Sequence, residues 1–139
     1  MANTTDYEPK TLRKFLQECF PNQKIGKDYC VFVFADSQTG CPTCNRKFYE
    51  FLEMHVKSKP NCFIIMYSAG TLYDISGLLS AKNTYNDRKT RKFFPKGHKF
   101  EHSEAIIVTN NKIEKIIQIE PKTIHTSLPY LTEKINALK

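Results

Sequence analysis

Two cysteines separated by two residues, Cys41 and Cys44, are the residues of this sequence whose types and spacing best suit chemistry. Two thiols at this spacing can close a disulfide within one helical turn. A thiolate at the start of a helix faces unpaired backbone N–H groups and the positive end of the helix dipole. Such a thiolate is favoured over the thiol and is nucleophilic at neutral pH. The motif therefore predicts thiol–disulfide exchange.

The segments on either side of the motif have the patterns of a strand and a helix. Residues 29–35 form a nearly continuous apolar run, which is typical of a strand covered on both faces. After the motif, Phe48 and Phe51 belong to an apolar stripe at helical spacing that continues to about Lys57. Pro42 stands where a first helical residue favours proline, because the missing N–H would have no partner there. A strand, a short loop and a helix are thus predicted to position the motif.

The rest of the chain alternates between helical and strand patterns. Asn110-Asn111 is predicted to form a tight hairpin turn, because asparagine tolerates the positive φ that such a turn requires. The other predicted segments are a first helix over 7–20, a strand over 62–67, a weak helix over 72–79, an irregular rim loop over 83–102, hairpin strands over 105–109 and 112–119, and a final helix over 127–138.

This order of segments predicts the topology of the sheet. A strand, a crossover helix and a second strand form a parallel, right-handed pair, and the hairpin must add antiparallel strands to the same sheet. The predicted fold class is therefore α/β, with a four-stranded mixed sheet flanked by helices on both faces. We expect a single domain over residues 1–139, with residues 1–26 as a helical prefix. The motif then lies at the end of the first core strand, in the crevice where such sheets place their sites.

Together with this topology, Cys41-Pro42-Thr43-Cys44 resembles the redox motif of the thioredoxin-like superfamily, over roughly residues 27–139. The resemblance implies that Cys41 attacks a target disulfide and that the buried Cys44 resolves the mixed disulfide. Pro42 and Thr43 would tune the redox potential. The redox-active disulfide is then the only redox group, with no bound cofactor. The implied partners are a protein disulfide substrate and an electron-donor protein, and we expect a monomer that acts in cell redox homeostasis.

The chain departs from the thioredoxin pattern at three places. Gly40 stands where a tryptophan is usual, and the predicted strand before the motif carries no buried acidic residue. The stretch before the third core strand lacks the superfamily's cis-proline. Ser103, or else His102, aligns with that position and is a candidate for the loop beside which a substrate backbone pairs. These departures keep an interaction or accessory module of the same fold as the alternative function.

Two further alternatives use the same cysteines. Zinc or an iron–sulfur cluster held by Cys41, Cys44, His98 and His102 is one. The four ligands of a structural zinc site typically include a second pair, but the chain has no second cysteine pair of this spacing, and two loop histidines are more often solvated. We therefore predict no metal. A peroxiredoxin-like peroxidase is the other, but that family has threonine or serine three residues before its reactive cysteine, where this chain has Gln38.

The remaining cysteines are Cys19, Cys30 and Cys62, and all of them lie among apolar residues. Free cysteine behaves as a small buried apolar residue, so burial is the first expectation for each. A structural disulfide between Cys30 and Cys62, which open two strands predicted to lie side by side, is the alternative.

The charge and hydropathy of the chain limit its partners and its compartment. The formal net charge is +7, with the densest basic stretch over residues 88–99. No nucleic-acid motif accompanies this stretch, so we expect no nucleic-acid binding and a basic loop that favours acidic partner proteins. No segment approaches the roughly 20 apolar residues of a membrane helix. The expected location is cytoplasmic as the sequence is written, or periplasmic if a signal peptide was trimmed.

Overall fold

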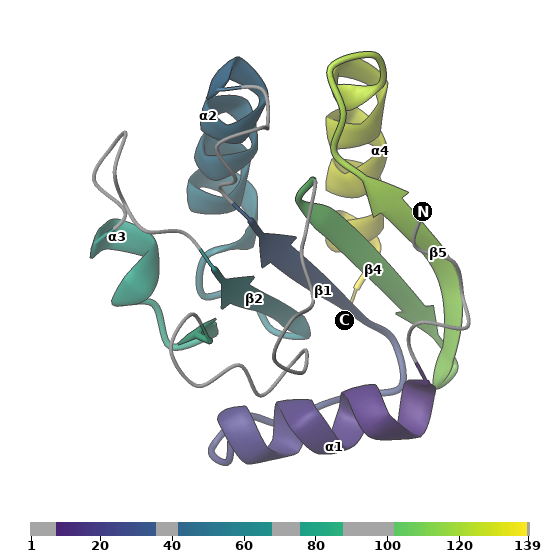
Figure 1. Cartoon of the computed structure of the whole chain (residues 1–139). Helices are drawn as coiled ribbons and strands as arrows, with labels where there is room; N and C mark the ends of the chain where they lie inside the picture. The colour runs from purple at the N-terminus through teal and green to yellow at the C-terminus, as the bar shows by residue number, and fades with distance from the viewer. Residues whose placement is uncertain (1–7, 36–41, 68–75, 88–101, 139) are drawn as a thin grey trace.

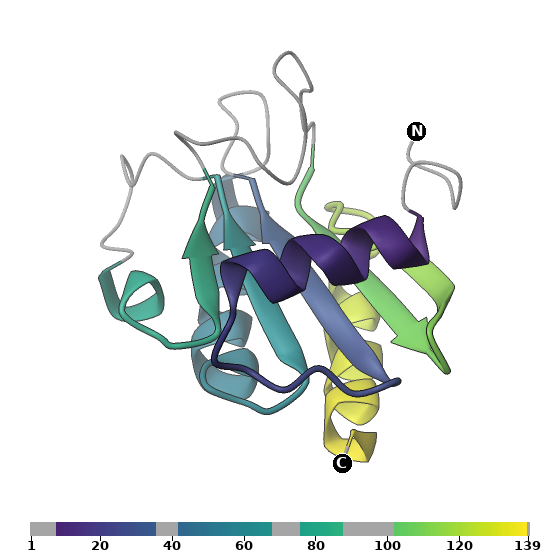
Figure 2. The same cartoon turned by 90° about the horizontal axis from the view of Figure 1, so that it is seen from below.

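The computed structural model describes residues 8–35, 42–67, 76–87 and 102–138. Its elements in chain order are α1 (Pro9–Cys19), β1 (Tyr29–Phe34), α2 (Pro42–Phe51), the π-helical η2 (Leu52–Val56), β2 (Cys62–Met66), α3 (Ser76–Leu79), β3 (Thr84–Asn86), β4 (Glu104–Thr109), β5 (Lys112–Gln118) and α4 (Ile124–Ala137). The strands form one mixed sheet in the order β3-β2-β1-β4-β5. Helix α1 covers one face, and α2 and α4 cover the other (Figures 1 and 2).

The predicted parallel pair and hairpin are both present in this sheet. Strand β1 runs parallel to β2 and antiparallel to β4, and β4 and β5 form the hairpin. Asn110 and Asn111 at its turn have φ angles of 52° and 61°. The expectation of positive φ at this turn is therefore confirmed.

The prediction of four strands is wrong, because the sheet has five. Strand β3 pairs in parallel with β2, with Ile64 opposite Thr84, inside the segment predicted to be an irregular loop. Buried Asn83 anchors its start: the side-chain amide donates to the carbonyls of Val56 at 3.0 Å and Cys62 at 2.9 Å. Three residues are too few for a recognisable apolar alternation, so the pairing depends on this contact and on the open edge of β2.

The helix boundaries differ from the predicted ones by small, explicable amounts. The helix after the motif is α-helical only to Phe51 and then continues as η2, where the Lys57 N–H donates to the Leu52 carbonyl at 2.9 Å. Helix α4 begins at Ile124 rather than at residue 127, because the Ile124 N–H donates to the Glu120 carbonyl at 2.9 Å. Of the weak helix predicted over 72–79, α3 covers the last part, and 72–75 lie outside the described residues.

Strand β1 is buried at all of its positions, which confirms the prediction of a strand covered on both faces. Its side chains alternate between the two cores: Phe32 and Phe34 pack with α2 and α4, whereas Val31 and Val33 pack with α1. Phe48 of α2 stacks on Phe34, with ring centroids 6.1 Å apart and planes 3° apart. This contact packs α2 against β1. No helix within the described ranges is long and apolar enough to cross a membrane.

Candidate active site

The carboxyl end of β1 and the start of α2 flank the motif. Strand β1 ends at Phe34 and α2 begins at Pro42, as predicted for that proline. Cys41 directly precedes the first helical residue and, like the rest of residues 36–41, lies outside the described part of the chain. The described part of the motif, residues 42–44, is therefore the first turn of α2.

Within that first turn, Thr43 is exposed and Cys44 is buried, with 6% of its surface accessible. Cys44 belongs to the core that also contains Phe34 and Phe48. The first turn of α2 contains no acidic residue, so no carboxylate on it opposes an anion at the helix start. The helix thus offers one sheltered thiol and a start that favours negative charge.

Ser103, which directly precedes β4, forms hydrogen bonds with Ala35, the residue that follows β1. Its hydroxyl accepts a hydrogen bond from the Ala35 N–H at 3.0 Å and lies 3.4 Å from the Ala35 carbonyl, to which it donates. Ser103 is 2% exposed, and its own carbonyl accepts from the Ile119 N–H at 2.8 Å. The residue predicted for the substrate loop therefore holds the last described residue before the segment that carries Cys41.

His102, the other candidate for that loop, faces a different partner. Its Nε2 lies 3.9 Å from Oε1 of Glu120, and the histidine is partly exposed. Ser103, and not His102, is thus the residue at the end of β1. No group of three or more His, Cys, Asp or Glu side chains that could hold a metal occurs among the described residues, and Cys41 and His98 of the metal alternative lie outside them.

Two buried carboxylates at the same edge of the sheet were not anticipated. Asp87, just after β3, is fully buried and accepts a hydrogen bond from the hydroxyl of Tyr67, which follows β2. Glu104 begins β4 opposite Val33 and is 5% exposed. Val33 belongs to the core under α1, so Glu104 lies on the face opposite Cys44. An isolated acidic residue gives no sequence signal of burial until the strand pairing is known.

Two of the three cysteines outside the motif lie near the other end of β1. Cys30 and Cys62 are register partners on the parallel strands β1 and β2, and no disulfide joins them. Burial raises the pKa of each thiol to about 12. Both are 1% exposed, so the prediction of buried apolar cysteines is confirmed for this pair, whereas Cys19 on α1 is partly exposed.

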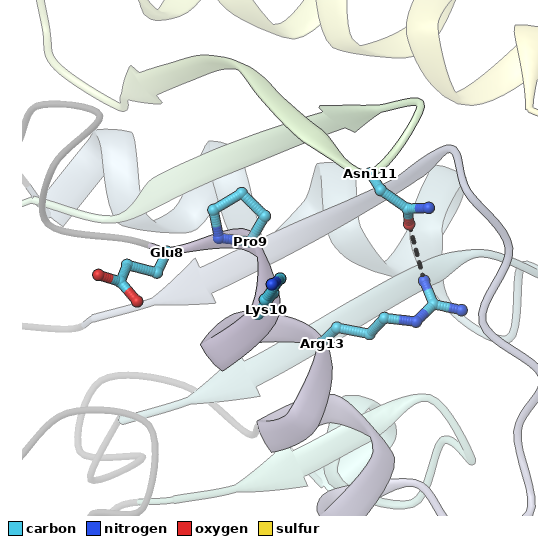
Figure 3. A pocket seen from close by; sticks show the side chains of 5 residues that line it. All are labelled: Glu8, Pro9, Lys10, Arg13 and Asn111. Carbon is cyan, nitrogen blue, oxygen red and sulfur yellow. Dashed lines mark hydrogen bonds between the residues drawn. The ribbon is translucent and has the colours of Figure 1, made fainter.

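A hollow of about 510 Å³ lies beside the start of α1, lined by residues 8–10, Arg13 and Asn111 (Figure 3). The Arg13 guanidinium donates to the carbonyls of Ile25 at 2.6 Å and Gly26 at 2.9 Å, and to Oδ1 of Asn111 at 3.1 Å. These bonds tie α1 to the hairpin turn, which lies at the amino end of β1. The wall of the hollow that Asn111 forms therefore lies at the end of β1 remote from the motif.

No family model, curated protein or solved structure matches this chain. The fold alone then defines the class: an α/β protein with a five-stranded mixed sheet flanked by helices.

Proposed function

We propose that this protein is a thiol–disulfide oxidoreductase that exchanges disulfides with protein substrates through Cys41 and Cys44. The observation that carries the proposal is the start of α2: Cys41 precedes its first residue, and its first turn holds buried Cys44 and no carboxylate. The loop between β1 and α2 leaves the carboxyl end of a parallel strand, where open α/β sheets place their sites. A thiolate at a helix start is both stabilised and nucleophilic.

The chemistry needs only the two thiols and a substrate disulfide. The Cys41 thiolate attacks one sulfur of that disulfide, and the other sulfur leaves as a thiolate that takes up a proton. The Cys44 thiol then loses its proton and attacks the Cys41 sulfur, which releases the second substrate thiol. The resulting Cys41–Cys44 disulfide is reduced by the dithiol of an electron-donor protein, so two electrons pass from donor to substrate. Pro42 and Thr43 would set the potential by shaping the backbone between the thiols.

A thioredoxin-like topology is part of the same proposal. It is supported by the parallel β1–α2–β2 unit, the antiparallel hairpin added beside β1 and the closing helix α4. Strand β3 extends this sheet at the edge beyond β2. Ser103 would occupy the position of the superfamily's cis-proline. Its hydroxyl accepts a hydrogen bond from the Ala35 N–H, a contact that a proline ring could not make.

The test is the redox equilibrium of the dithiol against glutathione, with each cysteine followed by alkylation and mass spectrometry. We expect a reversible two-electron couple confined to Cys41 and Cys44, and its potential would say whether the protein is a reductase or an oxidase. Cys41→Ser should remove the couple, whereas the matched variant Cys19→Ser should keep it. A wild-type pair that never cycles would overturn the proposal.

An accessory module with regulatory cysteines is the second candidate, and the surroundings of Ser103 favour it. No cis peptide bond occurs among the described residues, and Ser103 already bonds to both Ala35 and Ile119. A substrate backbone would then find this position occupied. Turnover separates the candidates: an oxidoreductase reduces insulin disulfides catalytically in the presence of dithiothreitol, and an accessory module does not.

A further inference from the structure

Strand β5 forms one outer edge of the sheet, and its backbone alternates between β4 and that edge. The Ile119 N–H donates to the Ser103 carbonyl at 2.8 Å, so this pair is a hydrogen-bonded one. In an antiparallel ladder such pairs alternate with pairs that do not bond to each other. Ile117, opposite Ala105, therefore bonds to β4, whereas Ile116 and Gln118 direct their N–H and C=O groups away from it. No described strand lies on that side (Figure 1).

The two halves of this edge are protected unequally. Charged side chains and bulges are common devices that keep edge strands from pairing with other chains. The first half of β5 has both: Lys112, Glu114 and Lys115 are exposed, and the register shifts opposite Ile107 and Val108. The second half, from Ile116 to Gln118, has no charged residue and no shift in register. Among the described residues, no strand pairs with the outward peptide groups of this half.

A groove runs beside the open half, between β5 and α4. Its volume is about 570 Å³. Charged, polar and apolar side chains line it, among them Lys115, Ile116 and Gln118 of β5, Glu120 after this strand, Thr123 at the start of α4, and Ser127 and Tyr130 of α4. An edge strand with a helix alongside is a geometry in which an extended peptide gains backbone bonds on one side and side-chain pockets on the other.

Two charged side chains of the described residues line the groove, Lys115 and Glu120, one on each side of the open half of β5. Oε1 of Glu120 lies 3.9 Å from Nε2 of His102, so the acidic side chain already has a neighbour. Lys115 Nζ lies 4.6 Å from the centre of the Tyr130 ring, and no described carboxylate forms an ion pair with it. Glu114 is already paired with Lys134, with 2.9 Å between Oε2 and Nζ. An acidic side chain on a bound peptide would therefore find an available ammonium group at Lys115.

We propose that the β5–α4 groove binds an extended, acidic segment of a partner protein, which pairs with Ile116 and Gln118 as a sixth strand. The net charge of +7 favours encounter with such a partner. The groove uses neither cysteine of the motif. Binding and disulfide exchange are therefore separable, and failure of one does not imply failure of the other.

Amide hydrogen exchange with a model peptide tests the pairing directly. The probe is a synthetic peptide of sequence TVEVTV, added to protein whose thiols have been alkylated. We expect the Ile116 and Gln118 amides to exchange freely without peptide and to slow by about tenfold or more when it is bound. The Ile117 amide, which bonds to β4, is the internal control and should be protected in both states. The lysine counterpart TVKVTV should bind about threefold to fivefold more weakly, the range of an exposed charge pair.

A proline substitution separates backbone pairing from side-chain contact. Gln118→Pro removes an N–H that points away from β4, so the existing ladder keeps its bonds. We expect it to weaken binding of TVEVTV by about tenfold, the value of one hydrogen bond at the upper end of its range. Gln118→Ala keeps the N–H and should bind like the wild type. Lys115→Glu should remove the preference for the acidic peptide.

Three results would overturn the proposal. One is slowed exchange at other amides with no change at Ile116 and Gln118. Another is equal binding of the acidic and basic peptides. The third is protection of the two amides in the free protein that depends on protein concentration, because a second copy of the chain would then cover the edge. All three results are measured on the wild-type protein, so they test the proposal even if Gln118→Pro fails to fold.

Discussion

Two pairs of cysteines flank β1, one near its amino end and one after its carboxyl end, and the secondary structure around them differs. Cys30 and Cys62 face each other on neighbouring parallel strands at the amino end, and both are 1% exposed. Cys41 and Cys44 are neighbours in sequence at the carboxyl end, where Cys44 lies in the first turn of α2. Proximity alone would favour the first pair as a disulfide, yet its thiols are free.

The comparison leads us to expect that the surroundings of a thiol matter more for its reactivity than its distance from another thiol. The pKa of Cys30 and that of Cys62 are both raised to about 12, mainly by burial, and at Cys62 the neighbouring Cys30 contributes to the rise. A thiol that stays protonated is a poor nucleophile. A helix start offers the opposite environment, because unpaired N–H groups stabilise a thiolate. Cys30 and Cys62 are therefore expected to be inert, whereas the motif cysteines are expected to be reactive.

The largest expected effect is the loss of exchange when the motif thiol is removed. Cys41→Ser should reduce the rate of insulin reduction to that of dithiothreitol alone, because the nucleophile of the exchange is lost. The matched double variant Cys30→Val/Cys62→Val fills the strand positions with a residue of similar size and should stay within about twofold of the wild type. An exchange rate that survives Cys41→Ser and falls in the valine variant would reverse the assignment of the two pairs.

Alkaline pH should destabilise the protein through ionisation of the Cys30 and Cys62 thiols. Native Cys30 and Cys62 hold their protons up to a pKa of about 12, whereas unfolded thiols release them from about 9.0, so stability falls as pH rises between these values. At pH 10 the loss is about 1.4 kcal/mol for each thiol, or roughly 3 kcal/mol for the pair.

Urea unfolding at pH 7 and pH 10 measures this loss as the difference between the wild type and the Cys30→Val/Cys62→Val variant. Burial also raises the pKa of Tyr29, but this residue is present in both proteins and cancels. Equal pH dependence of the two proteins would contradict the assigned thiol environment.

The core of the fold could be predicted from the sequence because its signals are local. The apolar run at β1, the position of Pro42 and the Asn110-Asn111 turn each correspond to a described feature. Strand β3 could not be predicted, because it has only three residues and depends on the edge of β2 and on the buried amide of Asn83. Short strands of this kind are determined by tertiary contacts and not by periodicity.

The candidate site could be predicted only in part. The spacing of Cys41 and Cys44 indicates exchange chemistry, and the described burial of Cys44 agrees with a sheltered second thiol. Glu104 and Asp87 could not be placed, because their position at the same edge of the sheet requires the strand order. The hydrogen bonds of Ser103 to Ala35 likewise join residues 68 positions apart in sequence. Contacts of this range carry no local pattern.

Weakening the carboxyl end of β1 should change the redox behaviour of Cys41 and Cys44 and leave the reactivity of Cys30 and Cys62 unchanged. Ser103→Ala leaves the Ala35 N–H, in a residue 5% exposed, without its hydroxyl acceptor. An unsatisfied buried donor costs about 2 kcal/mol, which urea unfolding would register. We also expect the potential of the Cys41–Cys44 couple to shift, because Ala35 leads into the segment that carries Cys41. The exposed Ser80→Ala is the control and should stay within about 0.5 kcal/mol of the wild type. An unchanged potential with reduced stability would limit Ser103 to a structural role.

Weakening the amino end of β1 should make Cys30 and Cys62 more accessible to reagents. This is the smallest of the expected effects. The Asn61 side chain accepts from the Gly26 N–H at 2.9 Å, and the Asn61 carbonyl accepts from the Cys30 N–H at 3.0 Å. Asn61→Gly keeps the positive φ of this position, which is 60°, and removes the side-chain bond at a cost of about 1 kcal/mol. If Cys30 and Cys62 react only when this end opens, their alkylation in the native protein should speed up about fivefold. Ser103→Ala acts at the other end and should leave that rate unchanged. An equal increase in both variants would mean that the thiols react through global unfolding, so the two ends of β1 would not open independently.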